Sequence, residues 1–166
     1  MNKKLIFLHI PKTAGQSVFQ YLENTFDSAD VCPFRVNHQY LDASIDPNDF
    51  VVHSGHIDWK LLEEALTGEK IFFTVLRAPL DRILSYYLYL RKEASKLSVA
   101  DLASDQSAGL RAALYMTPDE YFVDCKGEMR EFIDDHYDNF YLNYFSGKTY
   151  SAIRTNTGIK KSSLLK

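Results

Sequence analysis

The chain has 166 residues, with 19 basic and 22 acidic side chains and a formal net charge of −3. Its 46% hydrophobic and 25% charged residues are typical of a globular protein, which excludes intrinsic disorder and collagen-like or coiled-coil structure. The small negative charge also argues against nucleic-acid binding through a general basic field, because phosphate neutralisation needs clustered cations. A chain of this length is expected to form a single domain.

The N-terminus and the cysteines indicate the cellular context. The apolar run at residues 5–10 is too short for the core of a signal peptide or for a membrane span. Cys32 and Cys125 lack CxxC spacing, so we expect buried thiols rather than a disulfide framework or a zinc site. These features predict a cytoplasmic protein with no membrane span.

Strand and helix patterns alternate through the first 96 residues. Three short apolar runs predict buried strands of a parallel sheet, at residues 5–10, 50–53 and 71–76. Helical patterns follow them, one opening at Gly15 with Ser17 as its N-cap, one over about 58–66, and one from Pro79 to about 96. This order predicts an α/β fold of three layers, with helices flanking a central parallel sheet and ligands beyond the carboxyl ends of the strands.

Two other parts of the chain have different patterns. Residues 27–49 are rich in turn formers and predict an irregular connection. From residue 97 only helical signals follow, and Thr117-Pro118-Asp119-Glu120 resembles a capping box. Within one domain spanning 1–166 we therefore expect an α/β core at 1–96, a helical segment at 97–150 and a polar tail at 151–166.

The loop after the first strand contains the materials of an anion site. Its sequence is Pro11-Lys12-Thr13-Ala14-Gly15-Gln16-Ser17. Backbone N–H groups at a helix N-terminus carry partial positive charge, and Lys12 adds a full charge beside them. The loop is not a Walker A motif, which needs an earlier glycine. Taken alone, it is equally compatible with an ordinary capped turn between a strand and a helix.

The loop after the third strand supplies a second candidate anion site. Arg77 ends the apolar run, and Arg82 and Ser85 follow three residues apart on the next helix. An arginine fork and a serine hydroxyl suit a terminal phosphate, although Arg82 is also compatible with a solvated or salt-bridged helix residue. Two anion loops at one sheet edge predict a ligand with two separated anionic ends.

Two segments together resemble the cofactor motifs of the sulfotransferases. They are His9-Ile10-Pro11-Lys12-Thr13-Ala14-Gly15-Gln16-Ser17 and Leu76-Arg77-Ala78-Pro79-Leu80-Asp81-Arg82-Ile83-Leu84-Ser85-Tyr86-Tyr87. The resemblance is closest to the carbohydrate group that includes the heparan sulfate 2-O-sulfotransferases and their bacterial relatives. It implies a P-loop-like, nucleotide-binding core and the sulfuryl donor 3′-phosphoadenosine 5′-phosphosulfate (PAPS), with 3′-phosphoadenosine 5′-phosphate (PAP) as product and no metal.

The resemblance also implies roles for individual residues. The 5′ end of the donor would be held by Lys12, Thr13, Ala14, Gly15, Gln16 and Ser17, and the 3′-phosphate by Arg77 and Ser85. Lys12 would stabilise the leaving phosphate oxygen and the sulfuryl group. The acceptor would be a hydroxyl of a carbohydrate or another small polar molecule.

Sulfuryl transfer to a hydroxyl needs a base, and His56 is the candidate because imidazole titrates near neutral pH. It follows the second strand in a Gly-His context similar to that of sulfotransferases. His53 is the rival, although the strand pattern predicts its burial, and His9 is expected to orient Lys12 or the loop backbone. His38 and His136 are expected at the surface. The sequence contains neither an HExxH motif nor a carboxylate cluster, so it does not predict a metal site.

The later part of the chain departs from the family pattern. Residues 138–147 are only faintly similar to a helix that lines the acceptor side in relatives, and Asn143 stands where an arginine is expected. Relatives usually continue with further helices and a closing loop. The sequence therefore predicts a C-terminally shortened PAPS-dependent sulfotransferase, or a site completed by a partner, with a homo-oligomer left open.

Two other functions are compatible with these motifs. One is a non-catalytic module that binds PAPS or PAP. The other is a nucleotide-dependent phosphotransferase, which needs Mg²⁺ and an acidic residue to hold it. Asp81 in the second segment is better interpreted as a solvated helix charge, so neither motif supplies that acid.

Overall fold

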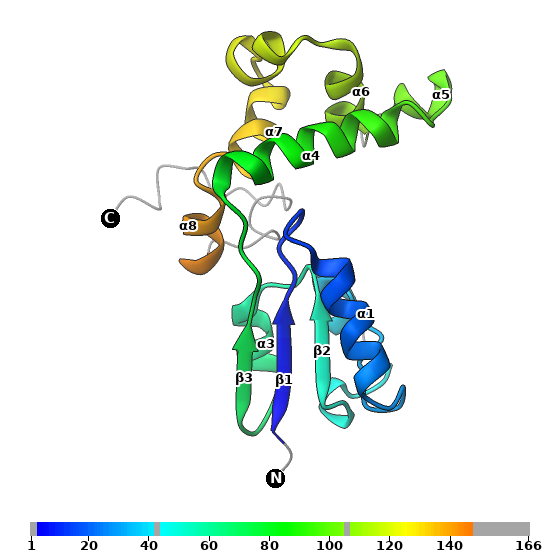
Figure 1. The fold of residues 1–166 in the computed structure, drawn as a ribbon, viewed down its shortest axis with the longest axis vertical. Coiled ribbons are helices and arrows are strands. Elements are labelled where there is room, and N and C mark those ends of the chain that lie inside the picture. Colours follow the sequence, from blue (N-terminus) through cyan, green and yellow to red (C-terminus); the bar gives the residue numbers. More distant parts are fainter. Residues whose placement is uncertain (1–2, 42–43, 105–106, 148–166) are drawn as a thin grey trace. The chain divides into compact units, whose positions relative to one another are not determined.

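The computed structural model describes residues 3–41, 44–104 and 107–147 (Figure 1). The described chain divides into two compact units. Residues 3–76 and 141–147 form the first, and residues 77–140 form the second.

A three-stranded parallel sheet lies at the centre of the first unit (Figure 1). Its strands are β1 (Lys4–Leu8), β2 (Val52–Gly55) and β3 (Lys70–Phe73), in the order β2-β1-β3. In the register of the sheet, Leu8 lies opposite Gly55 and Phe7 opposite Phe73. The central strand β1 is buried along most of its length, as its continuous apolar run predicts. The mixed α/β class with a parallel sheet is thereby confirmed.

The helical elements of the first unit connect these strands or follow them. They are α1 (Gly15–Thr25), α2 (Asn37–Leu41), the 3₁₀ turn η1 (Pro47–Asp49) and α3 (Trp59–Ala65), with α8 (Phe140–Phe145) after the second unit. Helix α1 packs through Val18, Phe19 and Leu22 in a cluster with Phe7 of β1. Helix α3 is drawn behind the strands in Figure 1. The segment 27–49, expected to be irregular, contains the two short elements α2 and η1.

The second unit is helical, as expected from the sequence. Its elements are α4 (Pro79–Ala94), α5 (Val99–Leu102), α6 (Ala108–Tyr115), the π-helical segment η3 (Glu120–Asp124) and α7 (Glu128–His136). The predicted capping box is present before η3, because Thr117 and Glu120 exchange hydrogen bonds between side chains and backbone. The prediction of this helix start is confirmed, although the segment that follows is π-helical.

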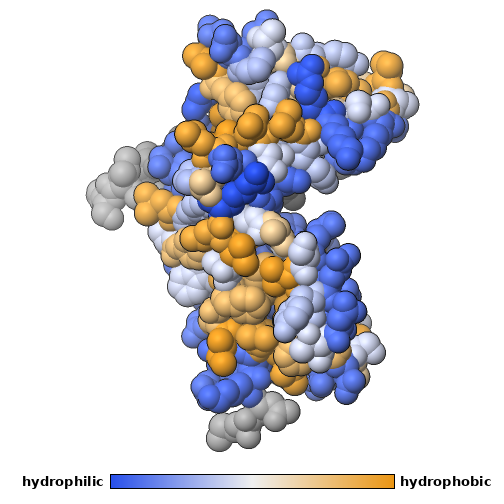
Figure 2. Space-filling model, viewed as in Figure 1, coloured by the Kyte–Doolittle hydropathy of each residue, from blue (hydrophilic) through white to orange (hydrophobic). Residues whose placement is uncertain are grey.

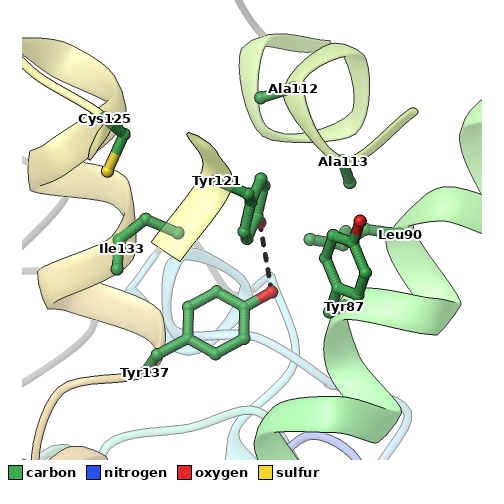
Figure 3. Packing of buried hydrophobic residues seen from close by; sticks show 8 residues of the cluster. All are labelled: Tyr87, Leu90, Ala112, Ala113, Tyr121, Cys125, Ile133 and Tyr137. Carbon is green, nitrogen blue, oxygen red and sulfur yellow. Dashed lines mark hydrogen bonds between the residues drawn. The ribbon is translucent and has the colours of Figure 1, made fainter. Parts of the chain in front are cut away.

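An aromatic core holds the second unit together (Figure 3). Its buried members are Tyr87, Leu90, Ala112, Ala113, Tyr121, Cys125, Ile133 and Tyr137. The hydroxyls of Tyr121 and Tyr137 hydrogen-bond each other at 3.1 Å, so each buried phenol has a polar partner. Cys32 and Cys125 are free and buried, as expected.

Apolar side chains also reach the surface of both units (Figure 2). On α4 the buried positions include Tyr87 and Leu90, whereas Leu80, Leu84 and Leu88 are exposed. Leu80 and Leu84 therefore lie outside the core that α4 forms with α6. Within the described residues, no helix is both long and apolar enough to cross a membrane.

Candidate functional site

The loop that follows β1 has an unusual backbone. Lys12 and Ala14 have φ values of 69° and 65°, in the left-handed region that residues other than glycine rarely adopt. Each such residue costs about 1–2 kcal/mol. Thr13 between them is buried, and its hydroxyl donates to the carbonyl oxygen of Ile10 at 2.8 Å. Strain of this kind gathers at ligand-binding loops, so the conformation supports a binding role for this loop.

Helix α1 begins directly after this loop without a side-chain cap. Its N-cap residue is Ala14, whose side chain makes no capping hydrogen bond to the first-turn amides. The predicted capping role of Ser17 is therefore wrong, because Ser17 lies inside the first turn and donates its own N–H to Ala14. Lys12 is half-buried, and Gln16 and Ser17 are exposed. An uncapped helix N-terminus beside a lysine suits an anion.

Gly15 is needed for packing rather than for a left-handed conformation. A Cβ built on this residue meets Cδ2 and Nε2 of His9 at 1.8 Å. No other residue fits here unless the imidazole of His9 moves. Sequence reasoning did not predict this contact between Gly15 and the His9 ring.

His56 lies one residue beyond β2, next to the end of β1. Its backbone N–H donates to the carbonyl oxygen of Arg35 at 2.8 Å. Its Nδ1 lies 2.7 Å from the carbonyl oxygen of His9. A carbonyl oxygen only accepts, so Nδ1 carries the proton and the lone pair of the neutral ring is on Nε2. That tautomer can take a proton at Nε2, as a general base must.

His53 occupies a different environment although it is only three residues away. Its side chain is 0% exposed, which confirms the predicted burial. Nδ1 of His53 lies 3.0 Å from the hydroxyl of Tyr40, and burial lowers the pKa of His53 to about 4. His53 is a poor candidate base, because a substrate hydroxyl cannot reach its buried ring and because its low pKa makes the ring weakly basic. His56 is therefore the better candidate.

The turn after His56 is held by hydrogen bonds that sequence reasoning did not predict. The hydroxyl of Tyr144 on α8 donates to the carbonyl oxygen of Ile57 at 2.7 Å. Asn37 on α2 donates to the Asp58 carboxylate at 2.6 Å and accepts from the Asp58 N–H at 2.9 Å. Tyr144 lies 87 residues from its partner. Such distant contacts leave no signal in local patterns.

The second unit contains the other candidate anion ligands. Arg77 precedes α4 and is exposed, and Ser85 on α4 is half-buried. Arg82 is 2% exposed, donates to the carbonyl oxygen of His136 at 2.6 Å and lies 4.3 Å above the Phe140 ring. Its interpretation as a solvated helix residue is therefore wrong, because the buried guanidinium ties α4 to the last residue of α7 and to Phe140.

His136 also differs from its expected surface position. Its ring stacks on Phe132 at a centroid distance of 4.2 Å and on Tyr86 at 5.8 Å, and it is half-buried. His38, in contrast, is exposed as expected.

The structure thus places the predicted residues in two groups. Lys12, the loop to Ser17 and His56 belong to the first unit, where His9 contacts both Gly15 and His56. Arg77 and Ser85 belong to the second unit. Among the residues described, no three His, Cys, Asp or Glu side chains form a metal-binding group.

Comparisons with known proteins give a family for this arrangement. A protein-tyrosine sulfotransferase of Arabidopsis thaliana is 26% identical over 96 residues, which are 57% of this chain and 19% of that protein. The chain therefore spans about a fifth of the length of this relative. No solved structure matches the chain significantly. Residues 1–155 match the pattern of the Sulfotransferase family, so the chain belongs to the sulfotransferase family.

Proposed function

We propose that the protein transfers a sulfuryl group from PAPS to a hydroxyl acceptor, with His56 as the general base. The observation that carries the proposal is the hydrogen bond from Nδ1 of His56 to the carbonyl oxygen of His9. It sets the tautomer a base needs, at the carboxyl edge of a parallel sheet, where ligands of α/β folds bind.

The residues of the first unit fit the 5′ end of this donor. The strained loop and the uncapped start of α1 offer backbone amides to an anion, and Lys12 brings the positive charge. In this proposal the contacts to the 5′ end come from Lys12, Thr13, Ala14, Gly15, Gln16 and Ser17. Because the Thr13 hydroxyl is engaged inside the loop, Thr13 contributes its backbone N–H.

The 3′-phosphate is assigned to Arg77 and Ser85 in the same proposal. The guanidinium of Arg77 is exposed at the start of α4, where the first-turn amides of the helix also favour an anion. Arg82 is not included, because its guanidinium is buried against His136 and Phe140.

We also propose a three-layer, P-loop-like arrangement of the core. The chain moves from β1 to one neighbour and then across to the other, giving the order β2-β1-β3. Right-handed crossovers in opposite directions put their helices, α1 and α3, on opposite faces of the sheet.

PAPS supplies a sulfuryl group on a phosphate that leaves readily. The acceptor oxygen bonds to sulfur while the bond from sulfur to the 5′-phosphate oxygen breaks, and PAP departs. His56 takes the acceptor proton on Nε2, and its Nδ1–H bond to His9 stabilises the imidazolium that forms. Lys12 neutralises charge on the leaving oxygen. The remaining contribution of the protein is to hold the two reactants in line.

For the acceptor we propose a carbohydrate hydroxyl or the hydroxyl of another small polar molecule. The Arabidopsis relative is named for tyrosine sulfation, so a tyrosine phenol is the second acceptor class to test. Transfer of labelled sulfate from PAPS to glycan oligosaccharides and to tyrosine peptides, side by side, separates the two.

The test of the function combines nucleotide binding with transfer. We expect PAP to protect the protein in thermal unfolding without metal, by about 2.7 kcal/mol at a concentration 100 times its dissociation constant. His56→Ala should bind PAP like the native protein and lose about 10²–10⁴ in transfer rate. His38→Ala, which changes an exposed histidine on α2, is the matched control.

Three results would contradict the proposal. Protection by Mg-ATP but not by PAP would indicate a phosphotransferase. PAP binding without transfer to any acceptor would indicate a non-catalytic binding module. Normal transfer by His56→Ala would move the base elsewhere.

A further inference from the structure

We propose that His9 is a positioning residue, whose ring and backbone hold the His56 imidazole in the orientation and tautomer that accept a proton. The inference rests on the proposed function of His56 as the base. It assigns to His9 a different task from the orientation of Lys12 that the sequence suggests.

The two histidines are neighbours because of the sheet register. Leu8 of β1 lies opposite Gly55 of β2, and the N–H of His9 donates to the Gly55 carbonyl oxygen at 3.0 Å. His9 and His56 are the next residues on their strands. The parallel pairing therefore continues for one residue beyond the ends of β1 and β2, and it brings His9 and His56 side by side.

The His9 ring lies in a stack of three rings. The ring centroids of His9 and His56 are 4.3 Å apart with an interplanar angle of 29°. The Phe7 ring also stacks on His9, with a centroid distance of 5.7 Å and an interplanar angle of 14°. Phe7 and His9 share a face of the chain because strand side chains alternate. The His56 imidazole therefore lies against a ring that is itself supported.

Gly15, the first residue of helix α1, packs directly against the His9 ring. A Cβ at Gly15 would lie 1.8 Å from the ring, so the imidazole occupies the place of the missing side chain. Gly15 also opens the helix whose N-terminus is proposed to hold the 5′ end of the donor. One ring thus sets the position of the base relative to the donor loop.

The charge of His9 suits this task. Burial, together with the nearby charge of His56, lowers the pKa of His9 to about 4, so its ring is neutral at pH 7. A neutral ring lets His56 become an imidazolium without a second positive charge stacked on it. A ring with so low a pKa is also a weak base, so His9 is a poor candidate to take the acceptor proton itself.

The experiment compares His9→Ala, His9→Phe and the control His38→Ala. In His9→Phe a flat ring remains in the stack, whereas His9→Ala removes it and leaves the backbone carbonyl. We expect His9→Ala to lower kcat about 10- to 100-fold with less than about a threefold change in the KM for PAPS. His9→Phe should recover most of kcat. Circular dichroism and thermal unfolding establish that each variant is folded.

A second readout does not depend on activity. Long-range ¹H–¹⁵N spectra of imidazole-labelled protein report which nitrogen of His56 carries the proton. Without the stacked ring, the His56 imidazole can turn away from the His9 carbonyl oxygen, which the alanine variant keeps. We therefore expect the Nδ1–H tautomer in the native protein and in His9→Phe, and a mixture of both tautomers in His9→Ala. An Nε2–H tautomer in the native protein, or an unchanged tautomer in His9→Ala, would overturn the inference.

The two proposals fail in different ways. If the native protein transfers no sulfate but the tautomer responds to His9→Ala as expected, the proposed function is wrong and the positioning contact stands. If the native protein is active, His56→Ala is inactive and His9→Ala keeps its full kcat, the positioning role is wrong and the function stands.

Discussion

Replacing Gly15 with alanine tests the packing on which the site depends. In an open helix, alanine is more favourable than glycine by about 1 kcal/mol, so Gly15→Ala would ordinarily stabilise the protein. Here the new methyl group meets the His9 ring at 1.8 Å. The ring cannot turn away cheaply, because Phe7 and His56 stack on it. We therefore expect Gly15→Ala to lower the free energy of unfolding by about 1–3 kcal/mol, the usual range for overpacking.

A double-mutant cycle shows whether the loss comes from this contact. With His9→Ala in place the space beside Gly15 opens, and the same alanine should become neutral or stabilising. The coupling free energy between the two positions should therefore be about 2 kcal/mol, with the double variant more stable than the sum of the single changes. Gln20→Ala, at an exposed position of α1, should change stability by less than about 0.5 kcal/mol.

Equilibrium urea unfolding, followed by circular dichroism, measures all these variants under one set of conditions. A Gly15→Ala variant as stable as the native protein would contradict the predicted clash with the His9 ring. Equal destabilisation with and without that ring would also contradict it, because the strain would then lie elsewhere.

Two further predictions concern buried polar groups. Because His53 binds a proton near pH 6.5 when unfolded but only near 4 when buried, unfolding takes up protons between these values. The free energy of unfolding should therefore fall as the pH drops from 6.5 to 4, with about 1.4 kcal/mol per pH unit contributed by His53 and a similar slope by His9, whose pKa is also lowered to about 4. His53→Gln should remove about half of this slope, and an equal slope in both proteins would contradict the assignment. In the second unit, Tyr137→Phe leaves the buried Tyr121 hydroxyl without its partner and should cost about 1–3 kcal/mol, whereas Tyr121→Phe with Tyr137→Phe should cost less. Chemical unfolding measures this, and additive losses would show that the hydroxyls are independent.

The order of strands and helices in the first unit could be predicted from the sequence. Apolar runs and helical spacing are local properties, and they placed β1, β3 and α4 within a few residues of their bounds. The run at 5–10 was expected to be strand throughout, but β1 ends at Leu8. The strand expected at 50–53 is β2 at Val52–Gly55, which begins and ends two residues later than expected.

The site was only partly predictable, because its contacts join residues far apart in the chain. The burial of His53 followed from the strand pattern. The stacking of His9 on His56 did not, since it depends on a register that pairs Leu8 with Gly55. The only indication in the sequence was that His9 and His56 each come directly after a strand of the parallel sheet. The burial of Arg82 depends on a carbonyl 54 residues away, which helix periodicity does not reveal.

A crystal structure of the complex with PAP would show whether one nucleotide binds both the loop after β1 and the start of α4. We expect the 5′-phosphate on the backbone of residues 12–17 and the Lys12 ammonium, the 3′-phosphate on Arg77 and Ser85, and Nε2 of His56 facing the 5′ end. A nucleotide bound away from the loop after β1, or with its 5′-phosphate out of reach of both Lys12 and His56, would contradict this expectation.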